Sequence, residues 1–130
     1  MIAGVAVAAL VVPKSLGYAG IAGEMYLRAG RLDLARPQIE GILRTMYDPR
    51  NSLTNEVSAQ LHEHFGDKVY RTVVPRNVRL AEAPSHGIPA LLYDRYSRGA
   101  KAYMALAGEI IRREEKIALA GQADAIAIRE

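Results

Sequence analysis

The sequence KVYRTVVPRNVRLAEAPSHGIPALLYD, residues 68–94, decides the fold and holds most of the candidate functional residues. Its first residues alternate as a half-buried strand requires, and Pro75 should end that strand. Arg76 and Arg79 lie in the turn that follows, and we expect the proline- and glycine-rich remainder to take a non-helical path. Positive charge in a rigid loop after a strand end is typical of nucleotide and phosphate sites in open α/β sheets.

Length and composition favour one modest domain. Of the 130 residues, 50% are hydrophobic and 24% are charged, which is ordinary for a globular protein. A formal net charge of +3 permits an anionic partner without requiring one. The chain has no cysteine, which excludes disulfides and thiolate metal sites.

Residues 1–23, MIAGVAVAALVVPKSLGYAGIAG, form an apolar zone with one charge, Lys14. We expect an apolar helix that packs on the remainder or acts as a membrane helix, although Pro13 and Lys14 interrupt it. Within this zone, AGVAVAALVVPKSLGYAGIAG (residues 3–23) resembles the first transmembrane element of SulP-type anion transporters. Nothing downstream continues that resemblance, so we do not expect transport by this chain.

The remaining sequence alternates strand and helix patterns and predicts an α/β fold. The expected elements are a linker at 24–37, a buried strand at 39–47, a helix at 52–65, a strand at 68–74, a helix at 97–116 and a frayed tail at 118–130. Asn51 or Ser52 should cap the first helix, and Gly66 should end it. Because two strands make a poor sheet, this part looks like one end of a larger sheet.

Both helices are expected to bury one apolar face. In the helix at 52–65 these residues are Leu53, Val57, Leu61 and Phe65. In the helix at 97–116 they are Ala100, Tyr103, Met104, Ala107, Ile110 and Ile111, with Glu109 and Arg113 paired on the outer face.

Three stretches resemble the ParA/Soj family of chromosome- and plasmid-partitioning ATPases. They are EGILRTMYDPRN (40–51), HFGDKVYRTVVPRNVRLAEAPSHGIPALLYD (64–94) and SRGAKAYMALAGEII (97–111). The resemblance covers about residues 38–113 and corresponds to the C-terminal end of the family's domain. It implies that residues 38–117 are the C-terminal portion of a P-loop-type doubly wound sheet, in a truncated or rearranged relative.

The resemblance implies an ATP site whose adenine side lies in this chain. Thr45 and Met46 match the strand end that forms part of the adenine pocket. Pro75, Arg76 and Asn77 match the loop that closes over the base from the other side. In the family, ATP binding joins two subunits, and a ParB-type partner stimulates hydrolysis.

The resemblance also implies DNA binding without sequence preference, with Arg50 and Arg79 at positions that contact the DNA backbone. Arginines on adjacent loops can neutralise phosphates, which agrees with that expectation. The alternative is that Arg50 and Arg79 are solvated loop charges. Weaker candidates for the same surface are Arg76, Arg95 and Arg98.

The family's catalytic motif does not occur in these 130 residues. No Gly-Lys-Ser/Thr is present, and Lys14-Ser15 follows Pro13 in an apolar run. Without a lysine and backbone amides around the phosphates, phosphoryl transfer lacks its electrostatic catalyst. We therefore expect no catalytic residue, no magnesium site and no ATP hydrolysis by this chain alone, and leave open whether ATP still binds.

Other constellations are weak. His62, His64 and His86 lack a carboxylate pattern that would complete a metal site, and Ser85 with His86 cannot readily form a nucleophile–base pair. The expected partners are nonspecific DNA, a ParB-type protein, and a second copy or a complementing ParA chain. The resemblance implies a cytoplasmic, nucleoid-associated protein. The alternatives are a protein anchored in a membrane through residues 1–23 and a non-functional product of gene rearrangement.

Overall fold

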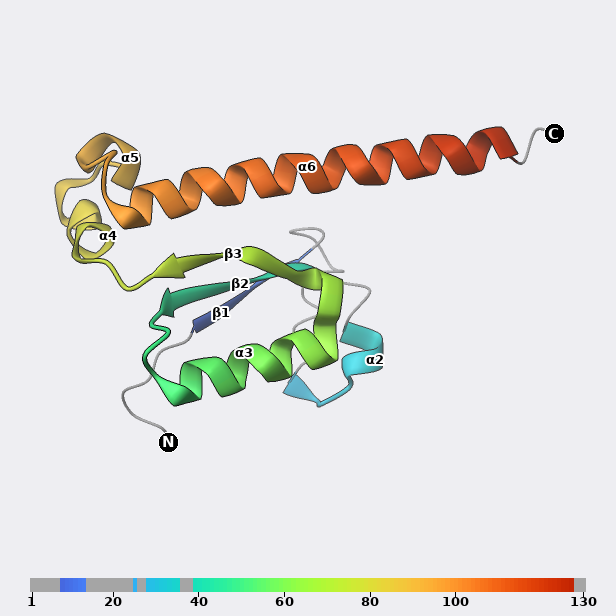
Figure 1. Cartoon of the computed structure of the whole chain (residues 1–130), viewed down its shortest axis with the longest axis horizontal. Coiled ribbons are helices and arrows are strands. Elements are labelled where there is room, and N and C mark those ends of the chain that lie inside the picture. The colour runs from blue at the N-terminus through green and yellow to red at the C-terminus, as the bar shows by residue number, and fades with distance from the viewer. Residues whose placement is uncertain (1–7, 14–24, 26–27, 36–38, 128–130) are drawn as a thin grey trace.

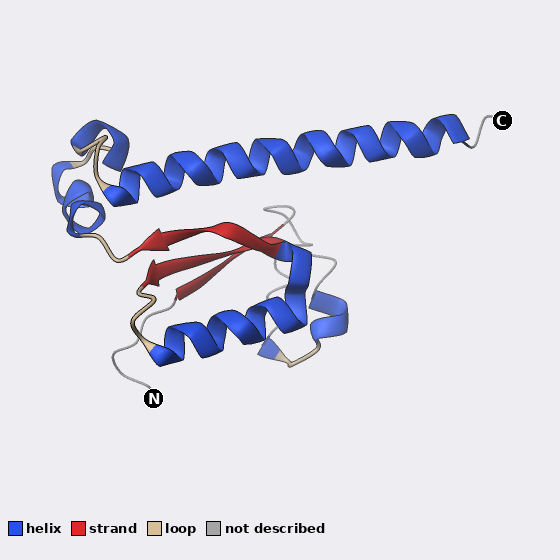
Figure 2. Cartoon of the chain, in the orientation of Figure 1, coloured by secondary structure: helices blue, strands red, loops and turns tan. Residues whose placement is uncertain are grey.

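The computed structural model describes residues 8–13, 25, 28–35 and 39–127, and its centre is a three-stranded sheet. The strand order is β1 (Ala8–Pro13), β2 (Ile39–Tyr47) and β3 (Val69–Pro75). β1 runs antiparallel to β2, and β3 runs parallel to it. Figure 2 shows the three strands as one layer between helices.

Helices cover both faces of the sheet. α3 (Ser52–Phe65) lies on one face, and α6 (Arg98–Ala127) lies on the other and continues well beyond the strands (Figure 1). The short helices are α2 (Leu32–Ala35), η2 (Gly66–Lys68), α4 (Val78–Glu82), η3 (Ala83–His86) and α5 (Ala90–Tyr93). α4 and α5 lie at the end of the sheet where β3 finishes (Figure 1).

The core consists of two clusters, one on each face of the sheet. Towards α3 it contains Ile39, Ile42, Phe65 and Val69, with Leu61 packed against them. Towards α6 it contains Leu43, Tyr70 and Val74, with Leu80, Ala102, Leu106 and Ile110 packed against them. The sheet is therefore the middle layer of an α/β/α arrangement.

Two glycines allow close packing on the α6 side. A Cβ on Gly41 would overlap the ring of Tyr70, and a Cβ on Gly99 would overlap the side chain of Leu80. The Arg113 guanidinium carbon lies 4.4 Å from the centroid of the Tyr70 ring, which is cation–π geometry. The absence of side chains at both glycines lets the Tyr70 ring cross β2 and lets Leu80 pack on the start of α6.

Glu109 and Arg113 hold α6 against the outer edge of β3. The backbone amides of Arg71 and Thr72 donate to the Glu109 carboxylate at 2.8 and 2.9 Å. Arg113 donates to the carbonyl of Val69 at 2.9 Å and to Glu109 at 3.0 Å. These side chains satisfy backbone groups of an edge strand, which would otherwise be open to pairing.

The pKa of Glu109 reflects this burial and pairing. Burial opposes ionisation, but the hydrogen bonds from Thr72 and Arg71 and the charge of Arg113 outweigh it and lower the pKa to about 2. Glu109 is therefore a buried, fully paired carboxylate. The prediction that the Glu109–Arg113 pair lies on the outer face of the helix is wrong.

The structure corrects the prediction for the N-terminal zone. Ala8–Pro13 is a strand paired with β2, not part of an apolar helix. The rest of the SulP-like stretch and of the linker at 24–37 lies largely outside the described residues. No helix among the described residues is both long and apolar enough to cross a bilayer.

The predicted strand at 39–47 and helix at 52–65 are confirmed. Asn51 caps α3 by accepting from the Leu53 amide at 3.0 Å, and α3 ends at Gly66, which has a φ of 49°. Leu53, Val57 and Leu61 are only half-buried, whereas Thr54 and Ser58 are buried. The buried face of α3 is thus rotated from the predicted apolar stripe towards these two polar side chains.

Three predictions for the second half of the chain were wrong. The segment after β3 contains α4, η3 and α5 rather than a non-helical path. α6 continues to Ala127, through most of the expected tail. Four side chains expected in its buried face, Tyr103, Met104, Ala107 and Ile111, are exposed, while Ala100 is buried and Ile110 half-buried. The domain boundaries themselves stay a prediction.

Candidate functional site

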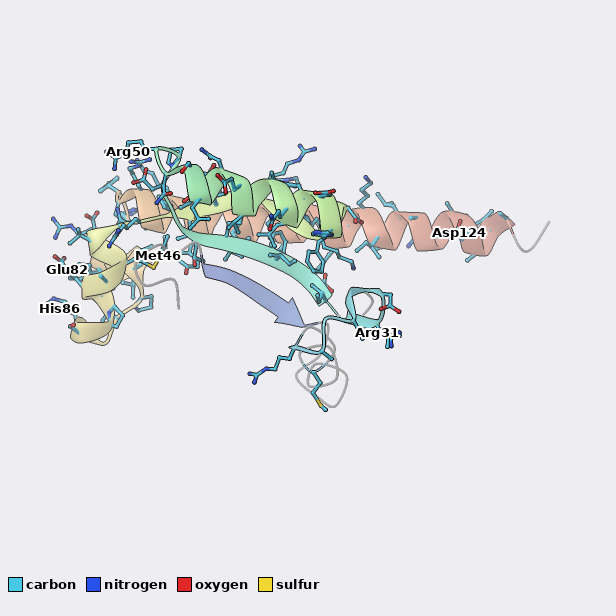
Figure 3. All side chains as sticks on the ribbon, turned by 90° about the horizontal axis from the view of Figure 1, so that it is seen from below. Arg31, Met46, Arg50, Glu82, His86 and Asp124 are labelled. Carbon is cyan, nitrogen blue, oxygen red and sulfur yellow. The ribbon has the colours of Figure 1, made fainter. Side chains whose placement is uncertain are left out.

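The candidate site lies where the parallel strands β2 and β3 end. Tyr47 and Pro75 are register partners, and the Arg76 amide donates to the Tyr47 carbonyl at 3.4 Å. The two segments that follow are residues 48–51 and residues 76–82, the second of which includes the short helix α4. Together they are named the strand-end loops. Figure 3 shows Met46, Arg50 and Glu82 at the same end of the molecule, far from Asp124 at the other end. The fold therefore brings both loops to one end of the sheet.

The expected adenine-side residues also meet at this end. Met46 has a φ of 50° and is 41% exposed, and it is the one non-glycine residue with positive φ in the described ranges. Such backbone strain costs about 1–3 kcal/mol and is common at ligand sites. Thr45 precedes it and is half-buried. The Asn77 side chain accepts from the Arg79 amide at 3.1 Å and so caps α4, which fixes the loop after Pro75.

Arg50 lies in the turn between β2 and α3 and is 88% exposed. Its Nε and Nη2 atoms donate to the two carboxylate oxygens of Asp48 at 3.0 and 2.9 Å. The same carboxylate accepts from the Arg50 backbone amide at 3.0 Å. Hydrogen bonds from the side chain and then the backbone of Arg50 lower the pKa of Asp48 to about 2. The turn thus presents the exposed guanidinium of Arg50 in an ion pair with the Asp48 carboxylate.

Arg79 lies in the first turn of α4 and is half-exposed. Its Nη1 donates to Glu82 at 3.0 Å, and its Nε lies 3.4 Å from the Asp94 carboxylate. The Tyr93 hydroxyl also donates to Glu82, at 2.8 Å. The hydrogen bonds from Tyr93 and then Arg79 lower the pKa of Glu82, and the bond to Glu82 raises the pKa of Tyr93. A cluster of four side chains therefore joins α4 to α5, and Arg79 belongs to it.

The weaker candidates are also placed by the structure. Arg76, Arg95 and Arg98 are exposed, and Arg95 lies over the Tyr96 ring at 5.6 Å. His86 stacks on Tyr93, with ring centroids 4.7 Å apart, and Ser85 adjoins it in η3. Among the described residues, no group of three or more His, Cys, Asp or Glu side chains could hold a metal ion.

Sequence reasoning missed the pairing of Arg50 and Arg79 with acidic side chains and the role of Arg44. Glu82 and Asp94 are three and fifteen positions from Arg79, and only the fold of α4 and α5 brings both to it. Arg44 is buried, and its Nη2 donates to the Tyr70 carbonyl at 3.0 Å. Its position in the middle of a mostly apolar strand, next to Leu43, was the one signal available.

No protein-family model matches the chain. Comparison with individual proteins does find relatives, and several of them are chromosome-partitioning proteins. The chromosome partitioning protein ParA of Caulobacter vibrioides is 56% identical over 79 residues. The chain is homologous to the ParA/Soj partitioning ATPases over this stretch. The sporulation initiation inhibitor protein Soj of Bacillus subtilis is 57% identical over 72 residues, and an uncharacterised protein of Pseudomonas putida is 70% identical over 79.

The homology confirms the resemblance predicted from the sequence, and it is partial. The match to the Caulobacter ParA covers 61% of this chain and 30% of that protein, and the match to the Bacillus Soj covers 55% and 28%. The mixed α/β structure with two parallel strands is consistent with part of a ParA fold. The roles of the adenine-side residues and of Arg50 and Arg79 stay predictions.

Proposed function

We propose that the strand-end loops bind duplex DNA through its phosphates without sequence preference, with Arg50 and Arg79 as the main contacts. The observation that carries the proposal is that both guanidinium groups belong to one end of the sheet. Figure 3 shows Arg50 and Glu82 at that end, and Arg79 is ion-paired with Glu82 at 3.0 Å. Homology to partitioning ATPases supports it, because those proteins act in the partitioning of chromosomes.

The chemistry of these groups suits phosphate rather than bases. A guanidinium offers a planar fork of donors that matches two phosphate oxygens, and both side chains are exposed enough to reach a ligand. Phosphate contacts position a protein on the duplex but carry no sequence information. Such binding should be sensitive to salt, because each neutralised phosphate releases condensed counterions.

The DNA-binding proposal is tested with the native chain and two labelled duplexes of unrelated sequence. Fluorescence anisotropy should give equal affinities for the two duplexes, because phosphate contacts do not distinguish sequences. With two phosphates neutralised, affinity should fall about tenfold between about 50 and 200 mM salt. Absence of binding at the lower salt, or a strong preference for one duplex, would refute the proposal.

We also propose that Thr45, Met46, Pro75, Arg76 and Asn77 form the adenine side of a nucleotide site. The support is that these five residues occupy adjoining strand ends and that Met46 holds a strained backbone conformation there. Titration of the isotope-labelled chain with ATP at millimolar concentration should move the amide resonances of Met46, Arg76 and Asn77 more than those of α6. Equal shifts throughout the chain would contradict this assignment.

A further inference from the structure

Arg79 is held by two carboxylates that come from different elements. Glu82 lies one turn further along α4, and Asp94 immediately follows α5. They contact different nitrogens of the guanidinium, Nη1 at 3.0 Å and Nε at 3.4 Å. The Tyr93 hydroxyl fixes the orientation of Glu82 by donating to the same oxygen that accepts from Arg79. Figure 3 shows Glu82 at the same end of the molecule as Arg50.

We propose that Glu82 and Asp94 limit the affinity of this surface for DNA, because they contact two of the three guanidinium nitrogens of Arg79 and place negative charge beside any phosphate bound there. This inference rests on the proposed function. A phosphate that binds two nitrogens of Arg79 must use Nε or Nη1, and each of these already contacts a carboxylate. The phosphate therefore competes with that carboxylate and binds close to its negative charge. Both effects oppose binding, so the two acids act as negative determinants of affinity for an anionic polymer.

Arg50 is less suitable for testing the effect of a paired carboxylate than Arg79. Asp48 holds Arg50 within a four-residue turn and also accepts from the Arg50 backbone amide, so its removal would disturb the turn. Glu82 can instead be replaced by glutamine, whose amide oxygen can still accept from Tyr93. Glu82→Gln therefore removes the charge that competes for Arg79 while keeping the contact between α4 and α5.

The expected change in DNA affinity follows from the exposure of the Arg79–Glu82 ion pair. Exposed ion pairs are weak and are screened by salt, so loosening one of them should change affinity by no more than about tenfold. Release of Arg79, together with removal of one negative charge near the phosphate, should strengthen binding roughly threefold to tenfold.

The experiment compares the affinities of variants for one labelled duplex at low salt. Glu82→Gln should bind roughly threefold to tenfold more tightly than the native chain, and Asp94→Asn should also bind more tightly. The matched control is Glu63→Gln, which makes the same change in net charge at an exposed position near the C-terminal end of α3 and should change affinity less than about twofold. In an Arg79→Ala background, Glu82→Gln should gain less than about twofold, because only the general effect of the removed charge remains.

Three outcomes would overturn the inference: no gain with Glu82→Gln, an equal gain with Glu63→Gln, or a gain of the same size in the Arg79→Ala background. If Arg50→Ala and Arg79→Ala weaken binding while Glu82→Gln changes nothing, this inference fails and the proposed function stands. If the native chain does not bind DNA, the proposed function fails and this inference fails with it. Thermal melting of each variant verifies that it remains folded.

Discussion

Replacing Glu109 with alanine should lower the free energy of unfolding by about 3 kcal/mol, because the substitution removes a buried carboxylate and leaves its partly buried partners unsatisfied. The amides of Arg71 and Thr72 lose their acceptor at the outer edge of β3, and Arg113 loses a carboxylate at 3.0 Å. The Glu109 side chain is only 11% exposed, so water replaces these hydrogen bonds poorly. Alanine has a high helix propensity and does not itself weaken α6.

The measurement is urea unfolding followed by circular dichroism. Glu115→Ala is the matched control, since it makes the same substitution at an exposed position of the same helix. That variant should stay within about 0.5 kcal/mol of the native chain. Equal stabilities of the two variants would show that the contact between α6 and the edge of β3 contributes little.

The same carboxylate predicts how stability depends on pH. The pKa of Glu109 is about 2 in the folded chain and has an ordinary value of 4.5, so folding favours the ionised form. Its contribution is complete above pH 4.5 and is lost as the pH falls towards 2, which corresponds to about 3 kcal/mol over the interval. The stability difference between the native chain and Glu109→Ala should therefore be largest at neutral pH and shrink on acidification.

Some elements could be predicted from the sequence because local signals agreed there. The strand at 39–47 is a short apolar run bounded by Pro37 and by the Asp48–Pro49 turn. The following helix has a capping residue, Asn51, a four-residue apolar repeat and a terminating glycine, Gly66. The end of the sheet that carries the candidate site followed from these elements and from Pro75, since parallel strands finish at the same edge.

Other features depend on interactions between distant residues and could not be predicted in the same way. The Ala- and Val-rich run at 8–13 suits a helix or a strand, and its pairing with β2 decides the outcome. The face of α6 that packs on the sheet includes Glu109, whose buried carboxylate binds β3. Hydropathy alone placed Tyr103 and Met104 on that face instead, but both are exposed. The acidic partners of Arg79 come together only through the packing of α4 against α5.

Replacing Arg50 and Arg79 together with alanine should weaken binding to duplex DNA roughly tenfold to a hundredfold at low salt. The reason is that the substitutions remove both guanidinium groups, and with them two charge-assisted contacts to phosphates. The slope of log affinity against log salt concentration should become less negative by about 2. Each phosphate that is no longer neutralised accounts for about 0.9 of this change. Arg50 and Arg79 each pair with carboxylates on the surface, so fold stability should change little.

The most direct test of the account is this salt dependence, measured by anisotropy for the native chain, for Arg50→Ala/Arg79→Ala and for Arg112→Ala/Lys116→Ala. The last variant removes the same charge from exposed positions on α6, away from the strand-end loops. We expect the slope to become less negative by about 2 for Arg50→Ala/Arg79→Ala. For Arg112→Ala/Lys116→Ala it should stay near the native value. Equal slopes and affinities for the two double variants would contradict the claim that the strand-end loops form the DNA-binding surface.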